Sequence, residues 1–254
     1  MLLVRRGAPE GSYFTDGDRA SGVFGVLATG FAILLGLVVV LAFTSYDESR
    51  AGAEDEARLV VQQLETAQLL PEEDRAPLTG ELVCYARSVV YQEWPLMEEG
   101  ELGEAVNPWG PALFRTLRTV DPETPASQAA YSKWLDQTSD RELARNDRVH
   151  GAVGVIPTAL WLVLFISAAV IFWFMLFFAD SGEGKVVQAT LMGGVTVVIT
   201  STLLLINVLD NPFRDGMGGL QPVAMERTLQ IMDEVLPVIG GVDPPCDAEG
   251  VATT

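Results

Sequence analysis

The chain has 254 residues and a formal net charge of −18, with 16 Lys and Arg against 34 Asp and Glu. Nucleic-acid binding needs clustered basic side chains, so this acidic balance, which has no such cluster, excludes a nucleic acid as the partner. The charge is uneven, because residues 22–44, 152–179 and 186–209 contain no charged side chain. Each stretch exceeds the roughly 18 apolar residues that can cross a hydrocarbon core. We therefore expect an all-α membrane protein with three transmembrane helices.

The first predicted span, residues 22–44, follows an N-terminal tail at residues 1–21. A cleaved signal peptide has an apolar core of about 7–15 residues and a cleavage site of small residues, and this stretch has neither. It is therefore expected to be a retained membrane anchor. Ala28, Ala32 and Gly36 recur at every fourth position of the span. Small residues at that spacing let two helices approach closely, which predicts a packing face within or between subunits.

A helical, acidic domain is expected between the first and second spans, at residues 45–151. Its beginning is rich in Ala, Glu, Gln and Leu, which favour a helix that continues the first span beyond the membrane. Further along, apolar residues recur at the spacing of one face of an amphipathic helix, namely Leu78, Leu82, Tyr85 and Val89.

Acidic residues gather in this domain between positions 93 and 104. They are Glu93, Glu98, Glu99, Glu101 and Glu104. Clustered carboxylates can hold Ca²⁺, but their spacing does not follow the alternating pattern of an EF-hand loop. The pattern therefore favours a solvated acidic surface over a metal site.

The other two spans differ in character. The second, residues 152–179, is rich in Phe and Trp, and such an aromatic surface is expected to face lipid and the membrane interface. The third, residues 186–209, carries a polar stripe, which consists of Gly193, Thr196, Thr200 and Asn207. A polar stripe can line a water-filled pathway, or it can hydrogen-bond to neighbouring helices, which is the favoured interpretation. Both interpretations direct this face into protein and away from lipid.

The last segment, residues 210–254, is expected to hold an amphipathic helix at 222–236 and then a disordered tail. The two cysteines, Cys84 and Cys246, give no CxxC motif, no zinc spacing and no disulfide framework. The sequence also contains no GxSxG, HExxH, Walker or nucleotide-binding glycine pattern. Neither an enzymatic activity nor a cofactor is therefore expected.

The orientation is predicted from Lys and Arg near the spans, because the cytoplasmic side carries the excess. Four of these basic residues lie on the side of the N-terminal tail and the 180–185 loop. Seven lie near the spans on the other side. This count predicts a multi-pass protein of the cell membrane with its N-terminus outside. Residues 45–151 would then lie in the cytoplasm, where the acidic domain can bind a cytoplasmic protein partner.

Five short signatures follow one another along the chain: Glu54-Asp-Glu-Ala57, Glu93-Trp-Pro-Leu-Met97, Arg145-Asn-Asp-Arg148, Ile156-Pro-Thr-Ala-Leu-Trp161 and Leu209-Asp-Asn-Pro-Phe213. In this order and spacing, about residues 20–235 resemble the bacterial and plant membrane family described as a bestrophin-like domain of unknown function. The resemblance implies a relation to bestrophins, which are oligomeric anion channels with four spans per subunit and a large cytoplasmic helical part. Three spans are a departure from that pattern. No catalytic or binding residue carries over, because the family's own activity is not established.

Two functional hypotheses follow for a chain embedded in the lipid bilayer. The leading one is an oligomeric channel-like or transport-related protein, a homo-oligomer whose spans form a helical bundle with the third lining any pathway. The competing one is a membrane-anchored interaction or regulatory protein that conducts nothing. No charged residue inside a span marks an ion or proton relay, which counts against a coupled transporter.

Overall fold

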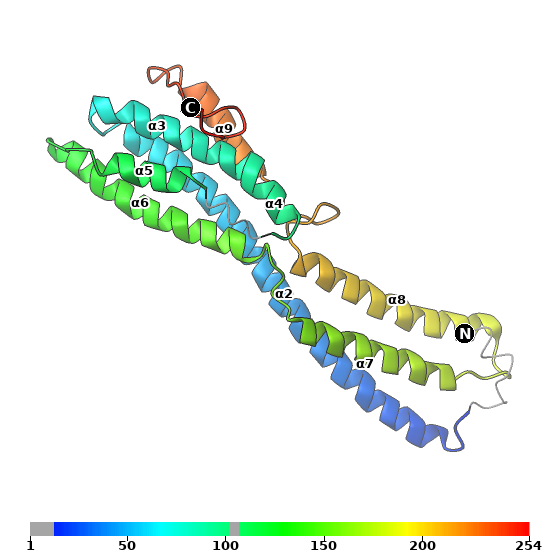
Figure 1. Ribbon diagram of the computed structural model, residues 1–254. Coiled ribbons are helices and arrows are strands. Elements are labelled where there is room, and N and C mark those ends of the chain that lie inside the picture. The colour runs from blue at the N-terminus through cyan, green and yellow to red at the C-terminus, as the bar shows by residue number, and fades with distance from the viewer. Residues whose placement is uncertain (1–12, 102–106, 254) are drawn as a thin grey trace. The chain divides into compact units, whose positions relative to one another are not determined.

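The computed structural model describes residues 13–101 and 107–253, and its regular elements are helices (Figure 1). Within those residues there is no β-strand, only one isolated bridge between Cys246 and Ala252. The chain divides into two compact units, each built from two stretches: Met1–Thr44 with Val155–Asp210, and Ser45–Gly154 with Asn211–Thr254. We call them the membrane unit and the second unit.

Three of the described helices are long and apolar enough to cross a membrane, namely α2 (Gly17–Ala67), α7 (Thr158–Phe177) and α8 (Lys185–Asp210). This confirms the all-α fold with three transmembrane helices. Helix α2 is one continuous helix that contributes its first part to the membrane unit and the rest to the second unit. The expectation that the first span continues as a helix beyond residue 44 is thus confirmed.

The core of the membrane unit consists of one stripe from each helix. Its members on α2 follow the spacing of three and four residues that places side chains on one helical face. The buried residues are Phe31, Leu35, Val38 and Ala42 of α2, Leu164, Ala168, Ile171 and Met175 of α7, and Ile199 and Ile206 of α8. Much of the remaining apolar surface of the three helices is exposed, as expected for helices surrounded by lipid.

The aromatic side chains of α7 face two ways. Trp173 is exposed, which agrees with the prediction of a lipid-facing surface. Phe174, in contrast, stacks against Phe14 with ring centroids 5.6 Å apart and against Phe24 at 5.9 Å. Part of the aromatic surface therefore packs against the beginning of the described chain and not against lipid.

Among its described residues, the second unit contains the rest of α2 and six further elements. They are α3 (Glu72–Ser88), the π-helical turn η1 (Val89–Glu93), α4 (Trp94–Glu98), α5 (Trp109–Leu117), α6 (Pro125–His150) and α9 (Val223–Val235). Helix α6 begins at a reciprocal capping box, in which Thr124 and Ser127 each accept a hydrogen bond from the other's backbone N–H.

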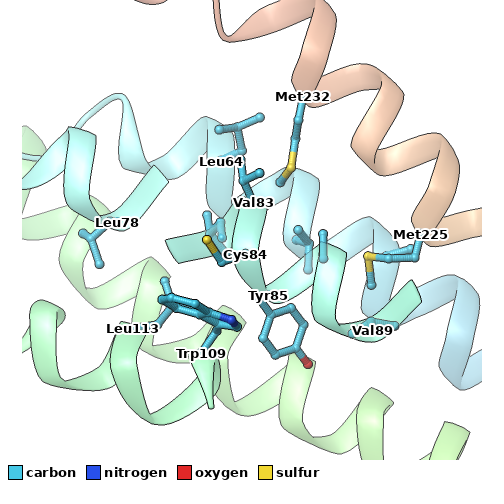
Figure 2. Packing of buried hydrophobic residues seen from close by; sticks show 14 of the residues in the cluster. Leu64, Leu78, Val83, Cys84, Tyr85, Val89, Trp109, Leu113, Met225 and Met232 are labelled. Carbon is cyan, nitrogen blue, oxygen red and sulfur yellow. The ribbon is translucent and has the colours of Figure 1, made fainter. Parts of the chain in front are cut away.

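Helix α3 is the centre of this unit, since it packs against both α5 and α9. The predicted apolar stripe is confirmed, because Leu78, Leu82 and Tyr85 of α3 and Val89 at the start of η1 are each at most 2% exposed. Figure 2 shows the core around α3, with Trp109 and Leu113 contributed by α5 and Met225 and Met232 by α9.

The segment after α9 is ordered, so the prediction of a disordered tail is wrong. Its apolar residues Val242 and Pro245 pack over Gly80 of α3, where an added Cβ would lie 3.2 Å from each. The Trp109 indole N–H donates to the Gly250 carbonyl oxygen at 2.7 Å. The tail therefore has apolar contacts and hydrogen bonds of its own with the core.

A disulfide bond joins Cys84 of α3 to Cys246 of the tail. The prediction that the two cysteines form no disulfide framework is therefore wrong. Their separation of 162 residues hides the pairing from any rule based on local spacing, and only the packing of the tail over α3 brings the two sulfur atoms together.

Candidate functional site

Three of the five sequence signatures meet inside the second unit, around Arg148 of α6. The fully buried Arg148 guanidinium donates from Nε to Glu56 at 2.5 Å and from Nη2 to Glu93 at 2.7 Å. Glu56 lies on α2 and Glu93 ends η1, and both carboxylates are buried. The Tyr85 hydroxyl donates to Glu56 at 2.5 Å. We call these four residues the Arg148 cluster.

Electrostatics explain how these charges are tolerated in the core. Burial alone would lower the pKa of Arg148, but the charges of Glu56 and Glu93 raise it above its ordinary value, so Arg148 remains a cation. Burial and then the Glu56 charge raise the pKa of the Tyr85 hydroxyl well above its ordinary value, so it remains a donor. Arg145, 3.4 Å from Glu93, adds positive charge beside the second carboxylate.

Glu93 is the last residue of the π-helical turn between α3 and α4. It lies four residues after Val89, so it continues the buried face of α3 at helical spacing. Its carboxylate contacts Arg148, while Tyr91 on the other side is exposed. Pro95 follows at the start of α4, where its missing N–H is tolerated.

The prediction of a solvated acidic surface at 93–104 is thus wrong for Glu93. Glu99 and Glu101 are exposed, Glu98 is half-buried, and Glu104 lies outside the described residues. Among the residues that the structure describes, no group of three or more His, Cys, Asp or Glu could hold a metal ion.

A second buried arginine lies beside the cluster. Arg141 of α6 donates to the Gln63 side-chain oxygen at 2.6 Å, and its guanidinium lies 4.5 Å from the centre of the Tyr85 ring. The Gln63 amide in turn donates to Thr138 at 3.0 Å. These contacts extend the polar network along the buried side of α6 against α2.

The other two signatures meet in the membrane unit, around Asp210 at the end of α8. Its carboxylate accepts hydrogen bonds from the Ile156 backbone N–H at 2.9 Å and from the Trp161 indole N–H at 3.1 Å. Asp210 is 5% exposed, and Pro157 precedes the first turn of α7. The carboxylate therefore joins the end of one span to the beginning of another.

The chemistry of the Arg148 cluster is that of a closed ion-pair network. Each guanidinium nitrogen has a partner, since Nη1 contacts the Met97 sulfur at 3.4 Å while Nε and Nη2 bind carboxylates. Four of the five N–H donors of Arg148 are thus used inside the core, and the side chain is fully buried. The cluster joins α2, α3, η1 and α6, and sequence reasoning missed it, although its charged residues stand inside the quoted signatures.

The polar stripe predicted on the third span lies on the exposed side of α8. Gly193, Thr196, Thr200 and Asn207 are all exposed in the single subunit. Gly193 and Thr196 line a groove of about 430 Å³ against Phe172 and Met175 of α7. Thr200 and Asn207 do not line this groove, so the structure brings together two of the four predicted residues.

The small-residue face of the first span is open along most of its length. Ala28 is half-buried, whereas Ala32 and Gly36 are exposed, and a Cβ added to Gly36 would meet no atom within 4 Å. Within one subunit, Gly36 therefore has no neighbouring helix whose close approach requires a glycine.

The sequence model of the Bestrophin-like domain family matches residues 1–222. No curated protein matches the chain in sequence. Among solved structures, a crystal structure of a membrane protein has a TM-score of 0.67 and 16% identity, over 87% of this chain and 88% of that one. A variant of a bacterial bestrophin homologue from Klebsiella pneumoniae has a TM-score of 0.66 and 17% identity, over 84% and 87%. These likenesses establish a shared fold, and with the family match over most of the sequence they show that the chain belongs to the Bestrophin-like domain family.

Proposed function

We propose that the protein is a homo-oligomeric, channel-like membrane protein in which α8 of each subunit faces a shared pathway. The observation that carries the proposal is the exposure of the α8 polar stripe in the single subunit. Polar side chains of a span favour protein or water over lipid as neighbours, so the exposed side of α8 is suited to face a water-filled pathway or another subunit.

The burial pattern of α8 agrees with this proposal. Its buried residues are Gln188, Ile199, Ile206 and Asp210, which lie beside the stripe and not on it. The Thr196 hydroxyl donates to the Met192 carbonyl within its own helix at 2.9 Å. Its oxygen can therefore still accept a hydrogen bond from water or from a neighbouring subunit.

The open face of α2 gives independent support for an oligomer. Ala32 and Gly36 are exposed in one subunit, and small residues at this spacing suit close packing of two membrane helices. We assign this face to contact between subunits. Membership of the Bestrophin-like domain family and a fold shared with a bacterial bestrophin homologue add to the case.

The test is conductance of the purified full chain in planar bilayers. The wild type should carry ion currents, and the triple variant Thr196→Leu, Thr200→Leu, Asn207→Leu should reduce them strongly because the stripe becomes apolar. Ser201→Leu is the matched control, since Ser201 is an exposed polar residue of the same helix about 100–140° away from the three substituted residues. It should leave the currents unchanged.

Silent bilayers, together with a monomeric mass in detergent, would contradict the proposal. That outcome would favour a membrane-anchored interaction protein whose acidic second unit binds a protein partner. Equal loss of current in the Ser201 variant would also count against a specific role of the stripe.

Location in the membrane follows from the family and the three apolar helices. We propose that the protein has no enzymatic activity, because the buried charged groups of the Arg148 cluster bind one another. We also propose that the N-terminal tail and the second unit lie on opposite sides of the membrane, since one span separates them.

A further inference from the structure

We infer that the second unit lies on the oxidising, non-cytoplasmic side of the membrane, where its Cys84–Cys246 pair is converted to a disulfide. The bond uses both cysteines of the chain. Disulfides form and persist in extracellular and periplasmic compartments, whereas cytoplasmic thiols are kept reduced. The orientation expected from the simple count of basic residues would place this bond in the cytoplasm.

The disulfide is built into the core of the second unit. The Cys84 side chain is fully buried on α3, and Cys246 is 6% exposed. A bond that is shielded in this way is poorly accessible to reducing thiols, because exchange requires direct attack on a sulfur atom. Burial therefore favours a permanent structural bond over a transient regulatory one.

Several neighbouring contacts hold the tail in the position that the bond requires. The Arg87 guanidinium donates to the Asp247 carbonyl oxygen at 3.0 Å, and the Gln92 amide donates to the Glu249 carbonyl oxygen at 3.3 Å. Gly250 adopts a positive φ of 83° and passes so close to Ser88 that a Cβ would lie 2.5 Å from its backbone nitrogen. These contacts hold the tail against α3 and η1 beyond the disulfide, and Val242 and Pro245 hold it over Gly80 on the other side.

The oxidation itself is a thiol–disulfide exchange with an extracytoplasmic protein disulfide as oxidant. The thiolate of one cysteine attacks that disulfide and forms a mixed disulfide, and the second thiolate then displaces the oxidant. One S–S bond forms in this chain, the oxidant's S–S bond is reduced to a dithiol, and the two thiol protons pass to it. Two electrons leave the chain in all.

The distribution of basic residues also predicts a non-cytoplasmic second unit once the length of each segment is considered. The positive-inside rule applies to segments shorter than about 60 residues, while longer ones translocate largely regardless of charge. The insertion at 45–154 exceeds that length, so its Lys and Arg count little. In the short segments, four basic residues lie on the side of the N-terminal tail and the 180–185 loop, and only Arg214 and Arg227 follow α8. This excess places the N-terminal tail in the cytoplasm.

The test begins with reporters behind the C-terminus of the full chain in a Gram-negative host. An alkaline phosphatase fusion should be active and a green fluorescent protein fusion dark, because the tail belongs to the second unit. The same reporters placed before the N-terminus are the matched control and should give the opposite result. A fluorescent C-terminal fusion would overturn the inference.

The bond is measured on the unfused wild type by trapping thiols in acid and labelling with a polymer-linked maleimide. No label should attach before reduction and two should attach after it. In a host that lacks its periplasmic thiol oxidase, two labels should attach without reduction. Free thiols in the ordinary host, or a disulfide that forms equally without the oxidase, would each overturn the inference. These readouts are independent of ion conductance, so silent bilayers leave them unaffected.

Discussion

At the residue scale, Arg148 binds two carboxylates, Glu56 and Glu93, while its own side chain has no exposure to solvent. Removing such a group from water costs several kcal/mol per ion, and only close pairing with opposite charge offsets that cost. Tyr85 adds a neutral hydrogen bond to Glu56, which satisfies a further carboxylate position without adding charge. The stability of the second unit therefore depends on the completeness of this network.

Replacing Arg148 by Ala should lower the free energy of unfolding by about 3–5 kcal/mol, because two buried carboxylates lose their partner. Arg58→Ala is the matched control, since Arg58 also pairs with an acidic residue, Asp55, but with its side chain 59% exposed. That variant should lose no more than about 1 kcal/mol. Thermal unfolding of the purified variants in detergent measures both, and similar losses would contradict the assigned role of Arg148.

Glu81 provides a test of pH dependence at the same scale. Burial raises the pKa of Glu81 above its ordinary value of 4.5, against the opposing effects of the Thr116 hydrogen bond and Arg115. The folded protein therefore holds this proton more tightly than the unfolded chain, and the resulting stability is complete below pH 4.5 and lost as the pH rises through the folded-state pKa.

Glu81→Gln should accordingly remove this loss, because glutamine keeps an acceptor for the Thr116 hydroxyl without a buried charge. Relative to the wild type, the variant should gain stability at neutral pH, and the gain should shrink as the pH falls toward the ordinary carboxyl range. Thermal unfolding followed from neutral to acidic pH measures this, and a difference that is constant with pH would contradict it.

At the scale of the elements, helices α2 and α6 come into backbone contact at Gly52. A Cβ at this position would lie 2.5 Å from the Arg148 backbone nitrogen and 2.7 Å from the Ala144 carbonyl oxygen. Only a residue without a side chain allows this approach, and the approach in turn brings Glu56, one turn further along α2, to the Arg148 guanidinium.

Gly52→Ala should therefore destabilise the second unit by about 1–3 kcal/mol, the usual cost of overpacking, although alanine is the better helix former. Gly110→Ala is the control, because Gly110 lies in α5 and a Cβ there meets nothing within 4 Å. The control should be neutral or slightly stabilising. The unfolding temperatures of the two variants measure this difference. A stabilised Gly52 variant would contradict the close contact between Gly52 and the backbone of α6.

At the scale of the whole molecule, the disulfide closes the chain across 162 residues. A cross-link between residues this far apart restricts the unfolded chain strongly. Removal of a native disulfide commonly lowers the free energy of unfolding by about 2–5 kcal/mol. The double variant Cys84→Ser, Cys246→Ser should lose that much stability. Reducing agent should destabilise the wild type over time and leave the double variant unchanged, and an equal response of both proteins would argue against the bond.

The sequence determined the features that depend on local order. Three charge-free stretches specify three membrane helices, and the spacing of Leu78, Leu82 and Tyr85 specifies the buried face of α3, because helical periodicity and the thickness of a bilayer act over neighbouring residues. The five signatures could also be identified in the sequence, but the contacts between them could not. The burial of Glu93 was missed because a carboxylate ordinarily faces solvent, although Glu93 continues this helical spacing four residues after Val89.

Only the tertiary structure decided which distant residues meet. Arg148 reaches Glu56 across 92 residues and Glu93 across 55, and Cys84 reaches Cys246 across 162. Such pairs depend on how whole helices pack, and the spacing of residues along the chain contains no information on it. For the same reason the tail was expected to be disordered, since its order comes from Gly80, Ser88 and Trp109, which the fold places beside it.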